Sequence, residues 1–506
     1  MGDSALAPGG ATRQTGEPVS EKEVPHFGSR IRRQPRRSFP TTSLPGRSAS
    51  HSANAATWPI LRADPVSRPA SALIDRIDTD NHSPRLRAQS DGRACRGSPP
   101  AARVGTLAEQ FGPLGAIPSA CRCRRVTSRF VSVAVTTWRS AMDVLLGIGT
   151  RKGLFLARSR DGRKTWEVSP PQFPVADVKA LAIDTRSETP RVLAGVLNSH
   201  FGPTMVVSDD LGQTWSEPDD APLAFPDDTD AALQGVWQIK PATEAEPDVV
   251  YAGVEPSALF RSEDGGRSFE LVRGLWDHPH RTQWQPGGGG LALHTILPHP
   301  ADTRRMAVAM STGGVYQTTD GGESWRPTNK GVTADFMPGE LPEWGQCVHK
   351  VALDAADPDT MYLQNHGGVF RSTDSGERWQ SIDGGLPPSN FGFPIVAHPR
   401  RPGVIYTFPL VADMDRFRFP PDAKCAVYRS EDGGQTWSAL SDGLPEVPFW
   451  AAVMRDAMCA DDAEPTGIYF GTRNGEVYCS ADEGDHWQLV ADKLPDVLCV
   501  RAAVIG

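Results

Sequence analysis

From Met142 to the C-terminus, the chain alternates between short apolar runs and polar, glycine-rich stretches. The runs are rich in Val, Ile and Tyr, as in VYAG from Val250, IYTF from Ile405 and IYFG from Ile468. Runs of this length and composition, bounded by Gly, Asp and Ser, are typical of β-strands. This part of the chain therefore predicts an all-β domain.

One polar stretch returns seven times as an eight-residue pattern close to S-x-D-x-G-x-T-W, which we call the box. Its copies begin at Ser159, Ser208, Ser262, Thr318, Ser372, Ser430 and Ser480. Successive copies start 49 to 58 residues apart, close to the length of a four-stranded propeller blade. Their number and spacing predict a β-propeller with seven blades.

Each box is typical of a hairpin turn between the third and fourth strands of a blade. An Asp such as Asp210 or Asp432 can accept hydrogen bonds from the turn, and the Gly two residues later supplies a positive φ. The terminal Trp offers a large apolar face to a neighbouring blade. A residue needed for seven turns is poorly explained by one active site, so we do not expect the box Asp residues to be catalytic. The first box differs most, with Arg163 in the usual Gly place.

The first strand-like run, VLLGIG from Val144, has no innermost strand ahead of it. The missing strand is predicted at the C-terminus, in LCVRAAVIG from Leu498. Pairing the two strands in one blade closes the ring and removes open sheet edges. We therefore predict a seven-bladed β-propeller over residues 142–506, closed by pairing its N- and C-terminal strands.

The repeated box resembles the Asp-box, or BNR repeat, of sialidases, xyloglucanase-type glycosidases, sortilin-like receptors and the plant photosystem II stability/assembly factor. The resemblance covers about Met142 to Gly506. The segment DVLLGIGTRKGLFLARS, from Asp143, also looks like the start of bacterial propeller proteins labelled glycosyl hydrolase or exo-alpha-sialidase. This likeness implies the propeller fold. The label glycosyl hydrolase or exo-alpha-sialidase belongs to the whole superfamily and does not by itself establish an activity.

Residues 1–141 differ in kind from the rest. They contain 20 Arg and 1 Lys against 10 Asp and Glu, and they are rich in Pro and Ser without sustained periodicity. Such a composition predicts a disordered extension. If the true translation start is Met142, this extension lies upstream of the protein. Residues 142–506 carry 31 basic and 51 acidic residues. We therefore expect neither nucleic acid nor an anionic membrane as a partner of the propeller.

Hydropathy and cysteine usage add to this picture. The chain has no run of 18 apolar residues that would span a membrane. Its eight Cys show no repeated spacing that would pair blades, so we interpret them as reduced thiols. We expect a cytoplasmic monomer without a cofactor, whose partner is a small polar ligand or a protein segment at the propeller mouth.

Blade topology gathers the boxes on one face and the long, non-repeating loops on the other. Propellers generally bind ligands at the second face, which is the funnel mouth. The predicted ligand-binding residues there are Arg151, Lys152, His200, Trp237, Trp284, His294, Trp344, His349, Lys350, Asn365, His366, Arg455 and Arg473. Alignment of the innermost strands also predicts a ring of equivalent positions around the funnel, formed by Trp237, His294, His349, Phe393 and Asp456.

The chemistry of the mouth has more than one interpretation. A non-catalytic binding or assembly role, with a polar carbohydrate or acidic ligand, is favoured, as the resemblance to the assembly factor implies. The alternative is a glycosyl hydrolase, which usually needs two carboxylates. Its candidate catalytic residues are Glu255, Glu343 and Asp456, with Glu340 as a further carboxylate, while Trp284 and Trp344 could stack on sugar rings.

An exo-alpha-sialidase is the specific enzyme that the resemblance implies. It would need an Arg triad, a Tyr nucleophile with a Glu partner, and a Phe/Tyr-Arg-Ile-Pro motif near the start. That motif is absent, and all seven Tyr fall in repeated strand positions. Four arginines could still bind a carboxylate or phosphate bidentately. They are Arg151, Arg281, Arg455 and Arg473.

A zinc site is a further alternative that is compatible with either role. Two residue pairs have i, i+2 spacing, namely His278 with His280 and Cys347 with His349. This spacing points both side chains to one side of an extended strand, and imidazole with thiolate suits zinc. No compact motif such as CxxC or HExxH accompanies them, so no metal is part of the main prediction.

Overall fold

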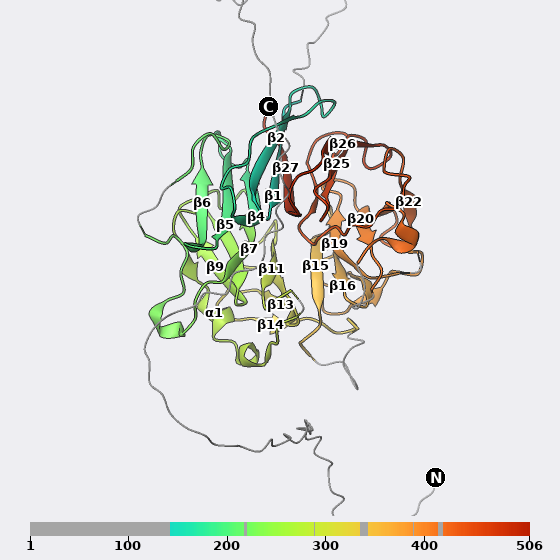
Figure 1. Cartoon of the computed structure of the whole chain (residues 1–506). Coiled ribbons are helices and arrows are strands. Elements are labelled where there is room, and N and C mark those ends of the chain that lie inside the picture. The colour runs from blue at the N-terminus through green and yellow to red at the C-terminus, as the bar shows by residue number, and fades with distance from the viewer. Residues whose placement is uncertain (1–141, 217–219, 288, 334–342, 388, 413–417) are drawn as a thin grey trace, which may run out of the picture. The chain divides into compact units, whose positions relative to one another are not determined.

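The computed structural model describes residues 142–216, 220–287, 289–333, 343–387, 389–412 and 418–506. All of them belong to one compact unit, Arg125–Gly506. Their strands form seven sheets, which are the blades of a β-propeller (Figure 1). The predicted seven-bladed all-β fold is therefore confirmed. The extension predicted for residues 1–141 lies outside the described residues.

We number the blades in chain order and give their strands from the axis outwards. Blade 1 contains β27 (Val497–Val504), β1 (Val144–Thr150), β2 (Gly153–Ser159) and β3 (Glu167–Val168), and blade 2 contains β4 (Asp177–Asp184), β5 (Arg191–Asn198) and β6 (Gly202–Ser208). Blade 3 contains β7 (Gly235–Pro241), β8 (Val250–Glu255), β9 (Ala258–Ser262) and β10 (Glu270–Leu271), and blade 4 contains β11 (Leu293–Pro298), β12 (Met306–Met310), β13 (Gly314–Thr318) and β14 (Arg326–Pro327).

The remaining blades have the same order. Blade 5 contains β15 (Val348–Leu353), β16 (Met361–Asn365), β17 (Gly368–Ser372) and β18 (Gln380–Ser381). Blade 6 contains β19 (Gly392–Ala397), β20 (Ile405–Pro409), β21 (Val427–Ser430) and β22 (Ser438–Leu440), and blade 7 contains β23 (Met458–Ala460), β24 (Ile468–Gly471), β25 (Val477–Ser480) and β26 (Trp487–Ala491). The loops of the described part hold α1 (Arg273–Trp276) and the 3-10 helices η1 (Asp227–Thr229), η2 (Pro279–Gln283) and η3 (Pro421–Ala423).

The ring closes in blade 1, as predicted. Strand β27 pairs antiparallel with β1, from Val144 opposite Val504 to Thr150 opposite Val497. Figure 1 shows the dark red β27 beside the teal β1. The innermost strands contact one another in sequence from β27 and β4 round to β23. The two ends of the propeller therefore share one sheet, and the largest hydrophobic cluster joins blades 1, 6 and 7 around them.

The boxes form the predicted turns. In the second box, Ser208 Oγ donates to Asp210 Oδ1 at 2.7 Å, and the backbone N–H of Thr214 donates to the same oxygen at 2.8 Å. Hydrogen bonds from the side chain and backbone of Thr214 lower the pKa of Asp210 to about 2. Box tryptophans also reach the preceding blade, since Trp437 Nε1 donates to the carbonyl of Ile382 at 2.9 Å. The box residues thus stabilise turns and blade contacts.

The exceptional Arg163 of the first box joins blade 1 to blade 7. Its Nη2 donates to Asp461 Oδ1 at 2.7 Å, and its Nε donates to Asp461 Oδ2 at 2.9 Å. The hydroxyl of Tyr469 contacts both partners, at 2.9 Å from Arg163 Nε and 2.7 Å from the Asp461 carboxylate. Both side chains of the ion pair are almost fully buried. Arg163 adopts a φ of 70°, where the other boxes favour Gly.

The cysteines and helices of the described part agree with the expectations of reduced thiols and of no membrane-spanning segment. The thiols there are free, with four of the five buried, and they belong to Cys347, Cys425, Cys459, Cys479 and Cys499. The other three Cys lie outside the described residues. No helix of the described part is both long and apolar enough to cross a membrane.

Candidate functional site

A β-bulge interrupts the innermost strands near their first residues, at the axis end opposite the boxes. The pairing register shifts at Lys179, Trp237, His294, His349 and Phe393. A bulge leaves an extra residue unpaired and re-aims its side chain. The bulges of blades 2 to 6 therefore each bring one non-repeating side chain to this end of the axis. The equivalence predicted for Trp237, His294, His349 and Phe393 agrees with this register, and Lys179 adds a member.

Aromatic rings and cations form the axis cluster, which we define as Lys179, Trp237, Glu255, Phe393 and Arg455. The Arg455 guanidinium lies 5.3 Å from the Trp237 ring centroid and 5.8 Å from that of Phe393, and Lys179 Nζ lies 5.0 Å from Trp237. Trp237 Nε1 donates to Glu255 Oε2 at 2.9 Å. Arg455 is 8% exposed, and its buried Nε has no hydrogen-bond partner among the described residues.

Glycines allow the chain to approach the axis cluster closely. A Cβ atom on Gly289 would lie 4.0 Å from both Arg455 Nη2 and the Trp237 ring. A Cβ atom on Gly290, which has a φ of 105°, would lie 2.2 Å from Glu255 Oε1. A larger residue at position 290 would therefore displace the Glu255 carboxylate. Gly289 and Gly290 thus lie close against this cluster.

An ionic cluster of Lys350, Asp456 and Arg501 lies beside it. Asp456 precedes β23 and bridges Cys499 of β27. Its Oδ1 accepts hydrogen bonds from Lys350 Nζ at 2.8 Å and from Arg501 Nη2. Burial alone would raise the pKa of Asp456, but Lys350 and Arg501 outweigh it and hold that pKa below its usual value. Burial also lowers the pKa of Lys350 to about 8, although Asp456 opposes that shift.

Both axis histidines are buried and held in fixed orientations. His294 Nε2 lies 3.1 Å from the carbonyl of Val348, to which it donates. His349 Nδ1 lies 2.6 Å from the carbonyl of Gly392 and is therefore its protonated nitrogen. Burial, reinforced by the nearby Arg455, moves the pKa of each imidazole well below the usual value. Both rings are therefore neutral at pH 7.

Cys347, His349 and His366 form a thiol–imidazole cluster with the donor set of a metal site. One ligand atom from each residue lies within 4.8 Å of the other two. Burial raises the pKa of the Cys347 thiol, against the effect of Arg455 and Arg418. The other predicted pair is already engaged, because His278 Nδ1 accepts from the His280 N–H at 3.1 Å and His280 Nδ1 contacts the Tyr316 hydroxyl at 3.1 Å.

Several predicted ligand-binding residues lie apart from the axis cluster. Arg151 contacts Asp177 and Asp496, each at 3.0 Å, and Arg473 pairs with the same Asp496. Lys152 and His200 are exposed. Asn365 is fully buried and donates to the carbonyl of Thr333 at 2.6 Å. Arg151 and Arg473 thus form ion pairs at the rim, while Asn365 has a structural hydrogen bond.

The two predicted sugar-stacking tryptophans pack between blades 3 and 4. Trp284 is 4% exposed, and its Nε1 donates to the Tyr316 hydroxyl at 2.9 Å. Trp344 stacks on the His280 ring at a centroid distance of 3.7 Å. Glu343 is exposed, and its backbone carbonyl accepts from Asn329. Trp284 therefore offers little surface to a ligand. Glu340, the further carboxylate, lies outside the described residues.

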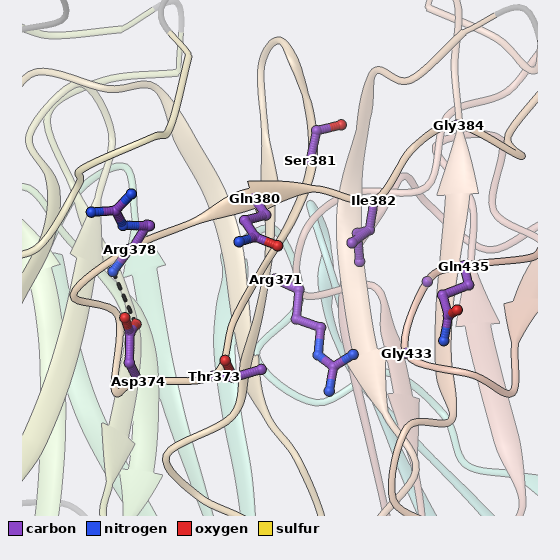
Figure 2. A pocket seen from close by; sticks show the side chains of 11 residues that line it. Arg371, Thr373, Asp374, Arg378, Gln380, Ser381, Ile382, Gly384, Gly433 and Gln435 are labelled. Atoms are coloured by element: carbon purple, nitrogen blue, oxygen red, sulfur yellow. Dashed lines mark hydrogen bonds between the residues drawn. The ribbon is translucent and has the colours of Figure 1, made fainter.

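A cavity of about 510 Å³ lies elsewhere, between blades 5 and 6. Figure 2 shows Arg371 and Gln380 of blade 5 facing Gln435 of the sixth box across it. Asp374 accepts a hydrogen bond from the backbone N–H of Arg378 at 2.9 Å within the fifth box. The lining consists of box turns and the strands beside them, and it includes no bulge residue. This cavity therefore belongs to the box side of the propeller.

Sequence reasoning missed Lys179, Arg418, Phe391 and Arg501. The alignment that predicted Trp237 and His294 also reaches Lys179 one blade earlier, so its signal was available. Arg418 lies 4.6 Å from the Phe391 ring and 5.2 Å from the Phe393 ring, from a long insertion between β20 and β21. Nothing in the repeat predicts where such an insertion folds. Only the structure shows that Arg418 of this insertion contacts the rings of Phe391 and Phe393.

Comparison with known proteins identifies the repeat. A family model described as BNR/Asp-box repeat matches residues 428–439, which contain the sixth box. A xyloglucanase from Paenibacillus sp is 26% identical over 172 residues, covering 31% of this chain and 15% of the enzyme. Xyloglucanase Xgh74A from Acetivibrio thermocellus is 24% identical over 266 residues, covering 46% of this chain and 29% of the enzyme. The matches thus span less than a third of these relatives.

Three solved structures align with part of this chain. The crystal structure of an ancestral GH74 enzyme aligns with a TM-score of 0.42 and 15% identity, over 62% of this chain and 38% of that chain. YCF48 bound to D1 peptide aligns with a TM-score of 0.39 and 15% identity, over 70% and 93% of the two chains. YCF48 from Cyanidioschyzon merolae aligns with a TM-score of 0.38 and 15% identity, over 71% and 94%.

Proposed function

Because the chain is an Asp-box β-propeller protein, we propose that its axis end opposite the boxes binds an acidic carbohydrate without transforming it. The observation that carries this proposal is Arg455. This guanidinium is 8% exposed, and its Nε has no hydrogen-bond partner among the residues that the structure describes, so it is suited to a bidentate carboxylate. The Trp237 ring beside it supplies an apolar face of the kind that packs on a sugar ring.

The two carboxylates nearest the axis, Glu255 and Asp456, favour binding over hydrolysis. A glycosidase needs one carboxyl group as an acid and a second as a nucleophile or base. Asp456 is engaged by Lys350 and Arg501, and Glu255 accepts from Trp237. Two carboxylates facing a substrate would suit catalysis, whereas these are occupied by protein donors. The proposed role is therefore recognition, with the acidic group of the ligand at Arg455.

We expect replacement of Arg455 by Gln to weaken binding of glucuronate about 10- to 100-fold, because each hydrogen bond to a charged group contributes about 1.5–3 kcal/mol. Calorimetric titration of the full chain with glucuronate, N-acetylneuraminate and neutral glucose measures this effect. Arg473→Gln is the matched control, since Arg473 already pairs with Asp496. Equal affinity for glucose and glucuronate, or unchanged binding by the Arg455→Gln variant, would contradict the proposal.

A glycosyl hydrolase is the second candidate, supported by the partial similarity to xyloglucanases. In that case Glu255 is the leading catalytic carboxylate, since it borders the axis cluster and is partly exposed. An exo-alpha-sialidase is the more specific form of this candidate. Assay against xyloglucan oligosaccharides, chromogenic glycosides and a chromogenic sialoside tests it. Turnover that Glu255→Gln abolishes would establish hydrolysis and replace the binding role.

The cellular setting follows from charge and cysteine content. Residues 142–506 carry 51 acidic against 31 basic residues, which disfavours nucleic acid and anionic membranes as partners. The five free thiols of the described part fit a reducing compartment. We therefore propose a cytoplasmic monomer that binds its ligand at the axis.

A further inference from the structure

The geometry points to a zinc-binding site that Cys347, His349 and His366 build at the axis end opposite the boxes. One sulfur and two imidazole nitrogens lie within 4.8 Å of one another. The set combines one thiolate with two imidazoles, which is the mixture of ligands that zinc prefers. None of its three ligands belongs to the axis cluster, although Arg455 lies close enough to act on Cys347.

The β15–β16 ladder brings two of the ligands together. Val348 pairs with Asn365, and the ladder continues by one step because the N–H of His366 donates to the carbonyl of Cys347 at 3.0 Å. Cys347 and His366 are therefore cross-strand neighbours. His349 follows at the bulge of β15, which turns its ring towards them. One residue of β15 and the two residues that flank the paired ends of β15 and β16 thus converge without any long loop.

The orientation of His349 is the strongest feature of the site. Its Nδ1 donates to the carbonyl of Gly392 at 2.6 Å, so Nε2 carries the lone pair. That Nε2 lies 3.6 Å from Cys347 Sγ. Metal-binding histidines are commonly fixed in this way by a carbonyl on the other ring nitrogen. The rings of Phe391 and Phe393, at 5.3 and 4.9 Å, restrict rotation of the imidazole.

The distances allow a metal ion to bind with small side-chain movements. Zinc lies about 2.3 Å from sulfur and about 2.0–2.1 Å from nitrogen, which sets its ligand atoms roughly 3.3–3.8 Å apart in a tetrahedron. The Cys347–His349 separation of 3.6 Å already meets this requirement. The other two pairs of ligand atoms lie within 4.8 Å, so about 1 Å of closure remains to reach the tetrahedral spacing.

Nearby positive charges determine which ligand would occupy the fourth coordination position of the metal ion. Arg455 and Arg418 act on Cys347 as positive charges, and they would repel a bare cation. The thiolate offsets one charge of the ion, and three protein ligands leave a fourth coordination position open. An anion or hydroxide at that position would be favoured by the same two guanidinium groups. The site is therefore suited to zinc with an exchangeable anionic ligand.

Cobalt titration of the chelator-treated, reduced full chain tests the site. We expect one Co²⁺ per chain, a near-ultraviolet thiolate-to-cobalt absorption band and displacement by stoichiometric Zn²⁺. Cys347→Ser should remove the band, and His366→Ala should weaken Co²⁺ binding at least tenfold. Cys425→Ser and His200→Ala are the matched controls, since neither residue belongs to the cluster, and both should leave the band and the affinity unchanged.

Two results would overturn this site. One is the absence of a thiolate band at saturating Co²⁺ in the wild-type chain. The other is a band that persists in a folded Cys347→Ser variant, which would assign the metal to another thiol. Melting temperatures in the presence of chelator identify variants that fail to fold. His366→Ala keeps the test valid in that case, because the His366 side chain is partly exposed and its loss leaves the thiol in place.

Discussion

Replacing Arg163 with Ala is expected to lower the free energy of unfolding by about 3–5 kcal/mol, because it leaves the buried Asp461 carboxylate without its countercharge. The pair is bidentate, with donor–acceptor distances of 2.7 and 2.9 Å, and its carboxylate is inaccessible to water. It joins the first blade to the last. Loss of the pair should therefore also speed hydrogen exchange of the β27 amides, which chemical denaturation and exchange mass spectrometry measure together.

Two variants in the same box separate the ion pair from other effects. Arg160→Ala removes an exposed pair with Glu167 and should change stability by less than about 1 kcal/mol. Arg163→Gly restores the residue that suits a φ of 70° but still removes the pair, so it should remain strongly destabilised. If Arg163→Gly were as stable as the wild type, the ion pair would contribute no more than the backbone relief that Gly brings at this φ, and the prediction would be wrong.

Arg163 also shows how far the sequence could predict the fold. The other boxes have Gly at this position, and their number and spacing predict seven blades. The missing strand ahead of Val144 predicts the closing strand at the C-terminus. The departure at Arg163 was visible, but its partner was not. Asp461 lies 298 positions away, in a loop that the repeat does not constrain. Repeats predict the contacts that every blade shares, whereas contacts made once require the three-dimensional arrangement.

The difference between shared and single contacts also explains which features of the candidate site the sequence could predict. Trp237, His294 and His349 could be aligned because each precedes a recognisable second strand by nearly the same number of residues. Their common environment depends on bulges, which the strand pattern does not reveal. Trp284 illustrates the opposite case. Its place in a long loop predicts exposure, yet hydrophobic burial draws it into the core between blades 3 and 4.

Asp456→Asn is expected to destabilise the propeller by about 3–5 kcal/mol at neutral pH, because two buried cations lose their common counterion. The side chain of Asp456 is 5% exposed and those of Lys350 and Arg501 are 12% and 22% exposed, so water screens them only weakly. Asp496→Asn is the matched control. Asp496 also pairs with two arginines, Arg151 and Arg473, but these are 48% and 37% exposed, so the expected loss is about 1 kcal/mol or less.

The destabilisation of Asp456→Asn should depend on pH with a defined sign. In the wild type the pKa of Lys350 is about 8 when folded, against 10.5 for an ordinary lysine, so the unfolded chain binds more protons between these values. This group therefore makes the folded state more stable as pH rises through that window. Asp456 raises the pKa of Lys350, so the variant should release this proton at a lower pH. Its deficit relative to the wild type should then shrink as pH approaches 8. A deficit that stays constant between about pH 6 and 8 would show that Lys350 does not carry the uncompensated charge.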